Sequence, residues 1–316
     1  MAGGQERVLR RRIKSVQATQ KITRAMELIA ASQIVRAQGR IAAAAPYQRA
    51  VARVLAEAAA EAGDNAGRLL GVPEAPARVM VLALVADRGL AGGYNANVLR
   101  ATERIVRAGR TEGVEYRLVT VGKKGPSFLR FRGLEVAEFF LGFSDRPTFA
   151  DARRVAPALS LPFLSEEIDQ VLIVSTRFLS AGSQVVETRQ LLPLPEPGEG
   201  PSEPAGPTGG HGADGGTEGE EPSRAGYTEF EPEASELLAD LIPRYVEAAV
   251  FGALLEAAAS EHTARQRAMA AATDNAEELV KTLSRIMNRA RQDAITTEIM
   301  EIVGGAEALR QAAKSR

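Results

Sequence analysis

Apolar and small residues recur in alternating steps of three and four near the end of the chain. From about Pro232 onward the residues are helix formers over roughly 80 positions, or about 120 Å if the helix is continuous. Pro243 interrupts this stretch, and we expect a kink one turn before it. The spacing predicts a coiled-coil seam. It consists of Met269, Ala272, Ala276, Leu279, Leu283, Ile286 and Ala290, and then shifts to Ile295, Ile299 and Ile302.

A second helical stretch begins the chain. Helix formers run from about Gly4 to Glu61, which predicts a rod of about 85 Å. Gly39 in its interior should cost about 1 kcal/mol relative to Ala, and Pro46 should kink the helix or end its first continuous piece. Two long helices joined through a compact middle section would pair as an antiparallel coiled coil.

The middle of the chain alternates between strand and helix patterns. Val79 to Ala86 has the continuous apolar character of a strand buried on both faces. The order of elements predicts a Rossmann-like α/β domain. The further segments are a helix over 95–108, a strand over 116–121, a helix around 127–131, a strand over 134–140, a helix over 149–164, and strands over 170–176 and 184–192.

The segment after the last strand is rich in Pro, Gly, Glu and Ser. Such a composition cannot bury enough apolar surface to offset the entropy of ordering, so we predict a disordered insert. The predicted fold class is therefore α/β, a long antiparallel coiled coil of terminal helices with a central Rossmann-like domain. The domain boundaries are 1–61 for the first helix, 73–193 for the α/β domain, 194–228 for the insert and 229–316 for the last helix.

The charge balance bears on possible partners. A net charge of -1 argues against general nucleic-acid binding, which needs a basic excess. The charge is unevenly distributed, since the first helix is basic and the segment 196–233 is acidic. The chain has no cysteine, which excludes disulfides, thiolate nucleophiles and cysteine-ligated zinc. Its longest apolar run is too short to cross a bilayer, so we expect no direct bilayer insertion.

Two glycine-rich turns resemble phosphate-binding loops superficially. One spans 87–95 and the other 122–125, but neither has the glycine pattern of a dinucleotide fold or the Lys-Ser/Thr ending of an ATP loop. A structural turn is favoured over nucleotide binding. His211 and His262 lack a second ligand at metal spacing, and Glu298 with Glu301 is typical of a solvated helix face. We therefore expect no metal, cofactor or catalytic residues in this chain.

Both ends of the chain nevertheless carry specific motifs. The chain resembles the gamma subunits of F-type ATP synthases through the start Ile13–Met26 and the terminal pattern Ile295-Thr296-Thr297-Glu298, Glu301, Gly305, Ala306 and Ala308. Residues 87–90, 92–93, 271–276 and 288–292 also resemble family positions. The family fold agrees with the fold predicted from the pattern.

The resemblance implies a function and a set of contacts. Gamma is a non-catalytic rotor whose rotation couples ion flow through a membrane c-ring to ATP chemistry on beta subunits. The implied partners are three alpha and three beta subunits, an epsilon subunit and the c-ring. The implied location is the cytoplasmic side of a bacterial cell membrane, bound peripherally. Implied beta contacts are Met26, Arg291, Gln292 and Thr296, and implied c-ring contacts are Arg36, Arg40, Phe230 and Glu231.

Two positions depart from relatives. Ala91 stands where many relatives have Cys, which a packed position tolerates. The insert lies where plastid relatives carry a redox-sensing cysteine pair, so a thiol switch is excluded. A solvated surface loop is favoured for the insert over an acidic brake. The alternative functions are a coiled-coil adaptor with an α/β docking domain, which leaves the terminal motif unexplained, and a nucleotide-dependent enzyme.

Overall fold

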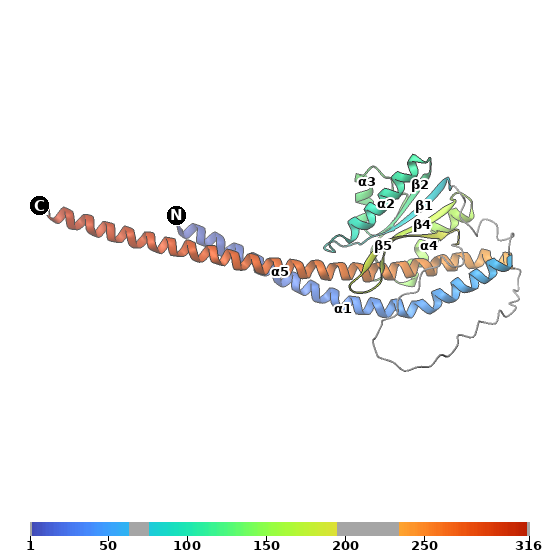
Figure 1. The fold of residues 1–316 in the computed structure, drawn as a ribbon, viewed down its shortest axis with the longest axis horizontal. Helices are drawn as coiled ribbons and strands as arrows, with labels where there is room; N and C mark the ends of the chain where they lie inside the picture. Colours follow the sequence, from blue (N-terminus) through green and yellow to red (C-terminus); the bar gives the residue numbers. More distant parts are fainter. Residues whose placement is uncertain (1, 63–75, 195–233, 315–316) are drawn as a thin grey trace, which may run out of the picture. The chain divides into compact units, whose positions relative to one another are not determined.

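The computed structural model describes residues 2–62, 76–194 and 234–314. Its two long helices are α1 (Ala2–Ala62) and α5 (Ala234–Lys314), coloured blue and orange to red in Figure 1. Pro46 and Pro243 lie inside these helices, so neither proline ends its helix. The predicted insert falls almost wholly on residues 195–233, outside the described part of the chain.

The chain divides into two compact units. One unit consists of α1 up to Ala31 together with α5 from Arg265 onward. The other unit runs from Ser32 to Ala264 and contains the α/β domain with the remaining parts of the two helices. The long helices therefore contribute to both units, a division that the sequence pattern did not indicate.

In the first unit the two helices pair antiparallel through a heptad seam. The hydroxyl oxygens of Thr23 and Thr273 lie 2.8 Å apart in the buried interface. Ile13 and Leu283 are both buried ten residues away from this pair in opposite chain directions. The steps on each helix alternate between three and four residues, as a coiled coil requires. The α5 seam consists of Met269, Thr273, Ala276, Val280, Leu283 and Met287.

The observed seam differs from the predicted seam in every second layer. Met269, Ala276 and Leu283 were predicted correctly, but Leu279 and Ile286 are exposed, at 40% and 46%. Thr273, Val280 and Met287 occupy the intermediate layers in their place. An apolar pattern disfavours threonine in a seam, yet its hydroxyl is satisfied here by Thr23 across the interface and by its own helix through the Met269 carbonyl.

The second unit contains a five-stranded sheet in the order β3-β2-β1-β4-β5. β1 pairs in parallel with β2 and β4, β2 pairs in parallel with β3, and β5 is antiparallel to β4. The strands are β1 (Arg78–Leu84), β2 (Glu115–Val121), β3 (Glu138–Phe140), β4 (Gln170–Phe178) and β5 (Gln184–Leu192). The helices of this domain are α2 (Tyr94–Thr111), α3 (Lys124–Phe131) and α4 (Phe149–Leu164).

Most predicted elements of the domain lie close to the observed ones. The main difference is the strand expected over 134–140, of which only Glu138–Phe140 pairs in the sheet. Gly133 at φ +74° begins the turn out of α3, and Leu134 is buried in the core rather than paired with β2. The predicted strand therefore combined a connection that packs on the core through Leu134 with the short strand that follows it.

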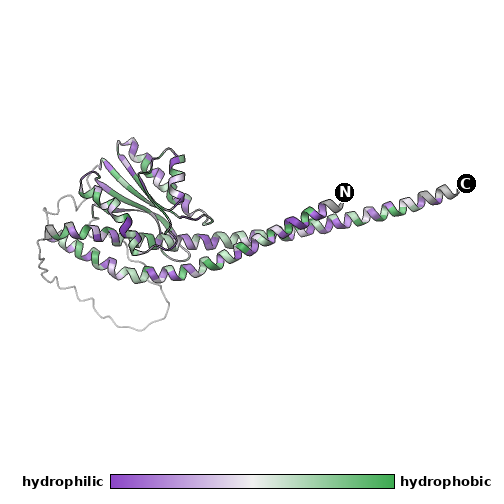
Figure 2. Cartoon of the chain, turned by 180° about the vertical axis from the view of Figure 1, so that it is seen from behind, coloured by the Kyte–Doolittle hydropathy of each residue, from purple (hydrophilic) through white to green (hydrophobic). Residues whose placement is uncertain are grey.

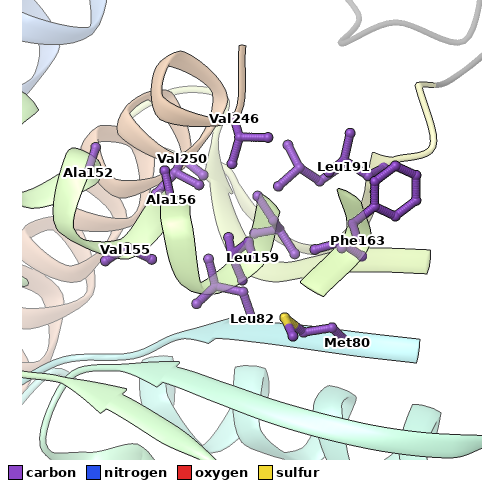
Figure 3. Packing of buried hydrophobic residues seen from close by; sticks show 14 of the residues in the cluster. Met80, Leu82, Ala152, Val155, Ala156, Leu159, Phe163, Leu191, Val246 and Val250 are labelled. Carbon is purple, nitrogen blue, oxygen red and sulfur yellow. The ribbon is translucent and has the colours of Figure 1, made fainter. Parts of the chain in front are cut away.

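Alternate residues of β1 serve two separate cores. Val79, Val81 and Ala83 pack on the side of α2 and α3. Met80 and Leu82 point the other way, toward Leu159, Phe163 and Leu191 (Figure 3). The second core also includes α5 and the end of α1, through residues such as Val246, Val250, Leu55 and Ala58. Figure 2 shows the resulting hydrophobic strands enclosed between helices.

Two glycines provide a matched test of backbone conformation. Gly122 has φ +100°, its N–H donates to the Phe140 carbonyl, and an added Cβ would collide with the Val85 carbonyl. Gly39 is helical with open space around its Cα. We expect Gly122→Ala to lower the unfolding free energy by about 3 kcal/mol or more and Gly39→Ala to raise it by about 0.5–1 kcal/mol. Urea unfolding of the full chain measures both, and equal effects would contradict this account.

Candidate functional site

Met26 belongs to an exposed apolar strip on α1. Ile22 and Ile29, one turn on either side of it, are exposed at 60% and 61%, and Met26 itself is half-buried. Residues at spacings of four and three share one helix face. The strip lies beside the seam and remains uncovered within its unit. An exposed apolar face of this kind is typical of an interaction surface.

The other predicted beta contacts lie elsewhere along the coil. Arg291, Gln292 and Thr296 are exposed on α5, and the Thr296 hydroxyl donates to the Gln292 carbonyl at 3.0 Å. Counting along both helices from the Thr23–Thr273 pair, Arg291 lies level with Gln5. That is about 30 Å from Met26 at 1.5 Å per residue. The predicted beta contacts therefore lie at two separate levels of the coil.

The last part of α5 extends beyond the beginning of α1 (Figure 1). By the same counting, Ala2 lies level with Ala294, so the following residues have no α1 partner. The predicted continuation of the seam is therefore wrong, because Ile295, Ile299 and Ile302 are exposed, the last at 72%. Met300 and Val303 are exposed as well. This helix end presents apolar side chains on several faces, which favours burial in a partner.

The coil also carries a basic face on α1. Glu6 pairs with Arg10 at 2.7 Å, and Glu27 pairs with Arg24 at 3.0 Å. Both acidic residues of this stretch are thus neutralised within the helix. Further cations are exposed and form no ion pair within the described part of the chain; these are Arg7, Arg11, Arg12, Lys14 and Lys21.

The predicted c-ring contacts can be placed only in part. Arg36 is exposed and Arg40 is half-buried, one turn apart on α1. The Arg40 guanidinium donates to the Pro147 carbonyl in the loop before α4. Phe230 and Glu231 lie outside the described residues.

A polar junction at the carboxyl ends of the strands was missed in the sequence. The Asp87 carboxylate follows β1 and accepts hydrogen bonds from the backbone N–H groups of Lys123, Gly142 and Ser144, at 2.9 to 3.1 Å. The Ser144 hydroxyl accepts from the Asp87 N–H and donates to Glu261 of α5. Backbone donors that could cradle a phosphate in this fold are therefore used by Asp87. The available signal was an Asp directly after a buried strand.

Polar residues of α5 dock the helix next to this junction. Ser260 donates to the Thr176 carbonyl at 3.1 Å, and the His262 ring lies 3.0 Å from the Asp145 carbonyl. His262 is buried, so its role in the described structure is to contact the loop before α4. No group of His, Asp or Glu side chains suited to a metal ion occurs among the described residues. Within the same residues, no helix is long and apolar enough to cross a membrane.

Sequence comparisons identify similar proteins over nearly the whole chain. A family model described as ATP synthase matches residues 5–309. The chain is 47% identical to an ATP synthase gamma chain from Frankia casuarinae, covering 97% of this chain and 98% of that protein. It is 43% identical to an ATP synthase gamma chain from Streptomyces coelicolor, covering 98% of each.

Solved structures share the fold. A chain of the rotor of the Euglena gracilis mitochondrial ATP synthase matches 93% of this chain and 99% of its own length, with a TM-score of 0.62 and 19% identity. A chain of the central stalk and c-ring of the Tetrahymena thermophila mitochondrial enzyme matches 79% of this chain and 99% of its own length, with a TM-score of 0.57 and 21% identity. At these identities the similarity establishes the arrangement of the elements.

The Asp87 junction makes a stability prediction. Asp87→Asn keeps the size of the side chain but replaces one acceptor oxygen with a donor, which leaves one or two of the loop N–H groups without this acceptor. We expect the unfolding free energy to fall by about 1–2 kcal/mol. Asp274→Asn, on the exposed face of α5, is the control and should change it by less than about 0.5 kcal/mol. Chemical denaturation measures both, and an unaffected Asp87→Asn would show that the junction is dispensable.

Glu256 on α5 predicts a pH effect. Burial raises the pKa of its carboxyl above the ordinary 4.5, although Arg189 and Arg177 oppose the shift. Because the carboxyl of Glu256 has a higher pKa in the folded chain than in the unfolded chain, its protonated form favours folding at low pH. This contribution to the unfolding free energy is lost as the pH rises through the pKa of the folded state. Glu256→Gln should therefore raise the melting temperature near pH 8, and its advantage should shrink toward about pH 4. The exposed control Glu278→Gln should show no such trend, and a pH-independent Glu256→Gln would refute the explanation.

Proposed function

Since the chain belongs to the family of ATP synthase gamma chains, we propose that it is the central-stalk rotor of a proton-translocating F-type ATP synthase. In this role it performs no chemistry itself. Catalysis takes place on beta subunits, and ion flow through a membrane c-ring turns the shaft. The proposed partners are three alpha and three beta subunits, an epsilon subunit and the c-ring, at the cytoplasmic side of a bacterial membrane.

The unpaired end of α5 is the observation that carries this proposal. Ile299, Ile302 and Val303 are exposed at 55%, 72% and 63%, in a stretch of α5 that no other described residue of its unit covers. Exposed apolar side chains on several faces of one helix suit an enclosing collar better than a flat docking surface. An alpha and beta ring provides such a collar.

The described surfaces also fit contacts along the shaft. The exposed cations on α1 suit acidic loops of beta near Met26, where charge complementarity would set orientation more than affinity. Arg291, Gln292 and Thr296 would contact beta at a second level, about 30 Å away. Arg36, Arg40, Phe230 and Glu231 would face the c-ring.

Asymmetry explains how such a shaft drives catalysis. One pair of helices cannot present the same surface to three beta subunits at once, so each beta subunit meets different side chains. A partner shifts a conformational equilibrium only by its differential interaction with the two states. Rotation would carry these preferences from one beta subunit to the next. Coupling would therefore depend on contacts at several levels of the coil.

Co-expression with alpha and beta subunits from the same source tests the proposal. With a tag on beta, we expect one copy of this chain per three beta subunits and ATP turnover that depends on it. Failure to co-purify would favour an adaptor function for the coiled coil.

A double substitution tests the carrying observation directly. Ile299→Asp with Val303→Asp places charges on the unpaired end of α5 and should reduce co-purification or turnover by about tenfold or more. Phe131→Asp is the control, because this side chain is 85% exposed but lies on α3 in the α/β domain. Full assembly and turnover of the double variant would show that the apolar end is not a contact.

A further inference from the structure

Arginine side chains converge on a small cavity in the second unit. The cavity has a volume of about 200 Å³ and is lined from three directions. Arg36 and Arg40 come from α1, Arg146 comes from the loop before α4, and His262 comes from α5. Ala37, Leu255 and Ala258 form its apolar part. The small alanine side chains leave space between the helices where larger residues would close it.

The positive charges at this cavity are not neutralised by the protein. Arg36 and Arg146 form no ion pair in the described part of the chain, and Arg40 donates to a neutral carbonyl, that of Pro147. Asp145 is the single acidic residue of the lining, and within the described chain its carboxylate makes no ion pair with these arginines. The lining therefore has an excess of two positive charges when His262 is neutral.

Guanidinium groups that have no carboxylate partner around one cavity select for an oxyanion. A guanidinium presents several N–H donors in a fixed fork that matches phosphate oxygens. A doubly charged phosphate would balance the excess, whereas a single carboxylate would leave part of it. The volume is below the roughly 300–1,000 Å³ typical of pockets that enclose whole small-molecule ligands. A phosphate group fits such a space, and the remainder of a larger molecule would stay outside.

We propose that the cavity formed by Arg36, Arg40 and Arg146 is a binding site for a phosphate group. This site goes beyond the rotor function and does not depend on it, although Arg36 and Arg40 are also proposed c-ring contacts. The group could be free inorganic phosphate or the headgroup of an anionic phospholipid. In either case Arg146, from the loop before α4, adds a third guanidinium to those of Arg36 and Arg40 on α1.

Titration of the full-length chain with inorganic phosphate, followed by calorimetry, tests the site. We expect saturable binding of one phosphate per chain. Arg146→Gln should weaken it at least tenfold, and Arg146→Lys should restore part of it because the charge remains while the fork is lost. Arg130→Gln on α3 removes another exposed arginine, one that does not line the cavity, and should bind as the unmodified chain does.

Vesicles distinguish the two sources of phosphate. Sedimentation with phosphatidylglycerol vesicles that depends on Arg146, against none with phosphatidylcholine, would assign a lipid headgroup. Saturable binding of inorganic phosphate without vesicle binding would assign the free ion. Absence of both, or equal loss in the Arg146→Gln and Arg130→Gln variants, would overturn the proposal. Co-purification with alpha and beta subunits is a separate measurement, so either proposal can fail alone.

Discussion

Burial of an apolar strip along a long helix is the constraint on which this structure depends. A helix gains little stability from its own backbone in water, so α1 and α5 persist because each covers the strip of the other. In the first unit the cover is a heptad seam, fixed in register by a buried hydrogen bond between Thr23 and Thr273. In the second unit the same helices instead join the core of a sheet, through Leu55 on α1 and Val250 on α5.

The constraint also explains where the chain offers surfaces to partners. α1 and α5 differ in length beyond the Thr23–Thr273 pair, so the end of α5 has no cover within its own unit. The exposed Ile302 and Val303 lie on that end. In the proposed rotor such a surface would be free to contact an enclosing collar, because no contact within its own unit occupies it. In the proposed assembly, burial of this end by a partner would stabilise the chain.

Polar side chains perform a different task in the α/β domain. The crevice at the carboxyl ends of parallel strands is the usual ligand position in this class of sheet. Here the Asp87 carboxylate takes up the backbone donors of two neighbouring loops, and Ser144 connects it to Glu261 of α5. The backbone N–H groups that could bind a ligand are therefore used to join loops of the domain, and the Ser144 hydroxyl links this junction to α5. The crevice at the strand ends therefore helps to hold α5 against the domain.

The sequence by itself determined the elements and their class. Helix propensity predicted both terminal helices, and the apolar run at Val79–Ala86 predicted β1, because these signals arise from neighbours along the chain. Tertiary structure decided which strip of α5 forms the seam, where Thr273 replaces the expected Ala272 layer. Tertiary structure also formed the hydrogen bonds of the Asp87 junction and placed Arg36 and Arg146 around the same cavity. The physical reason is that the cost of burying a polar group depends on a partner that is remote in sequence.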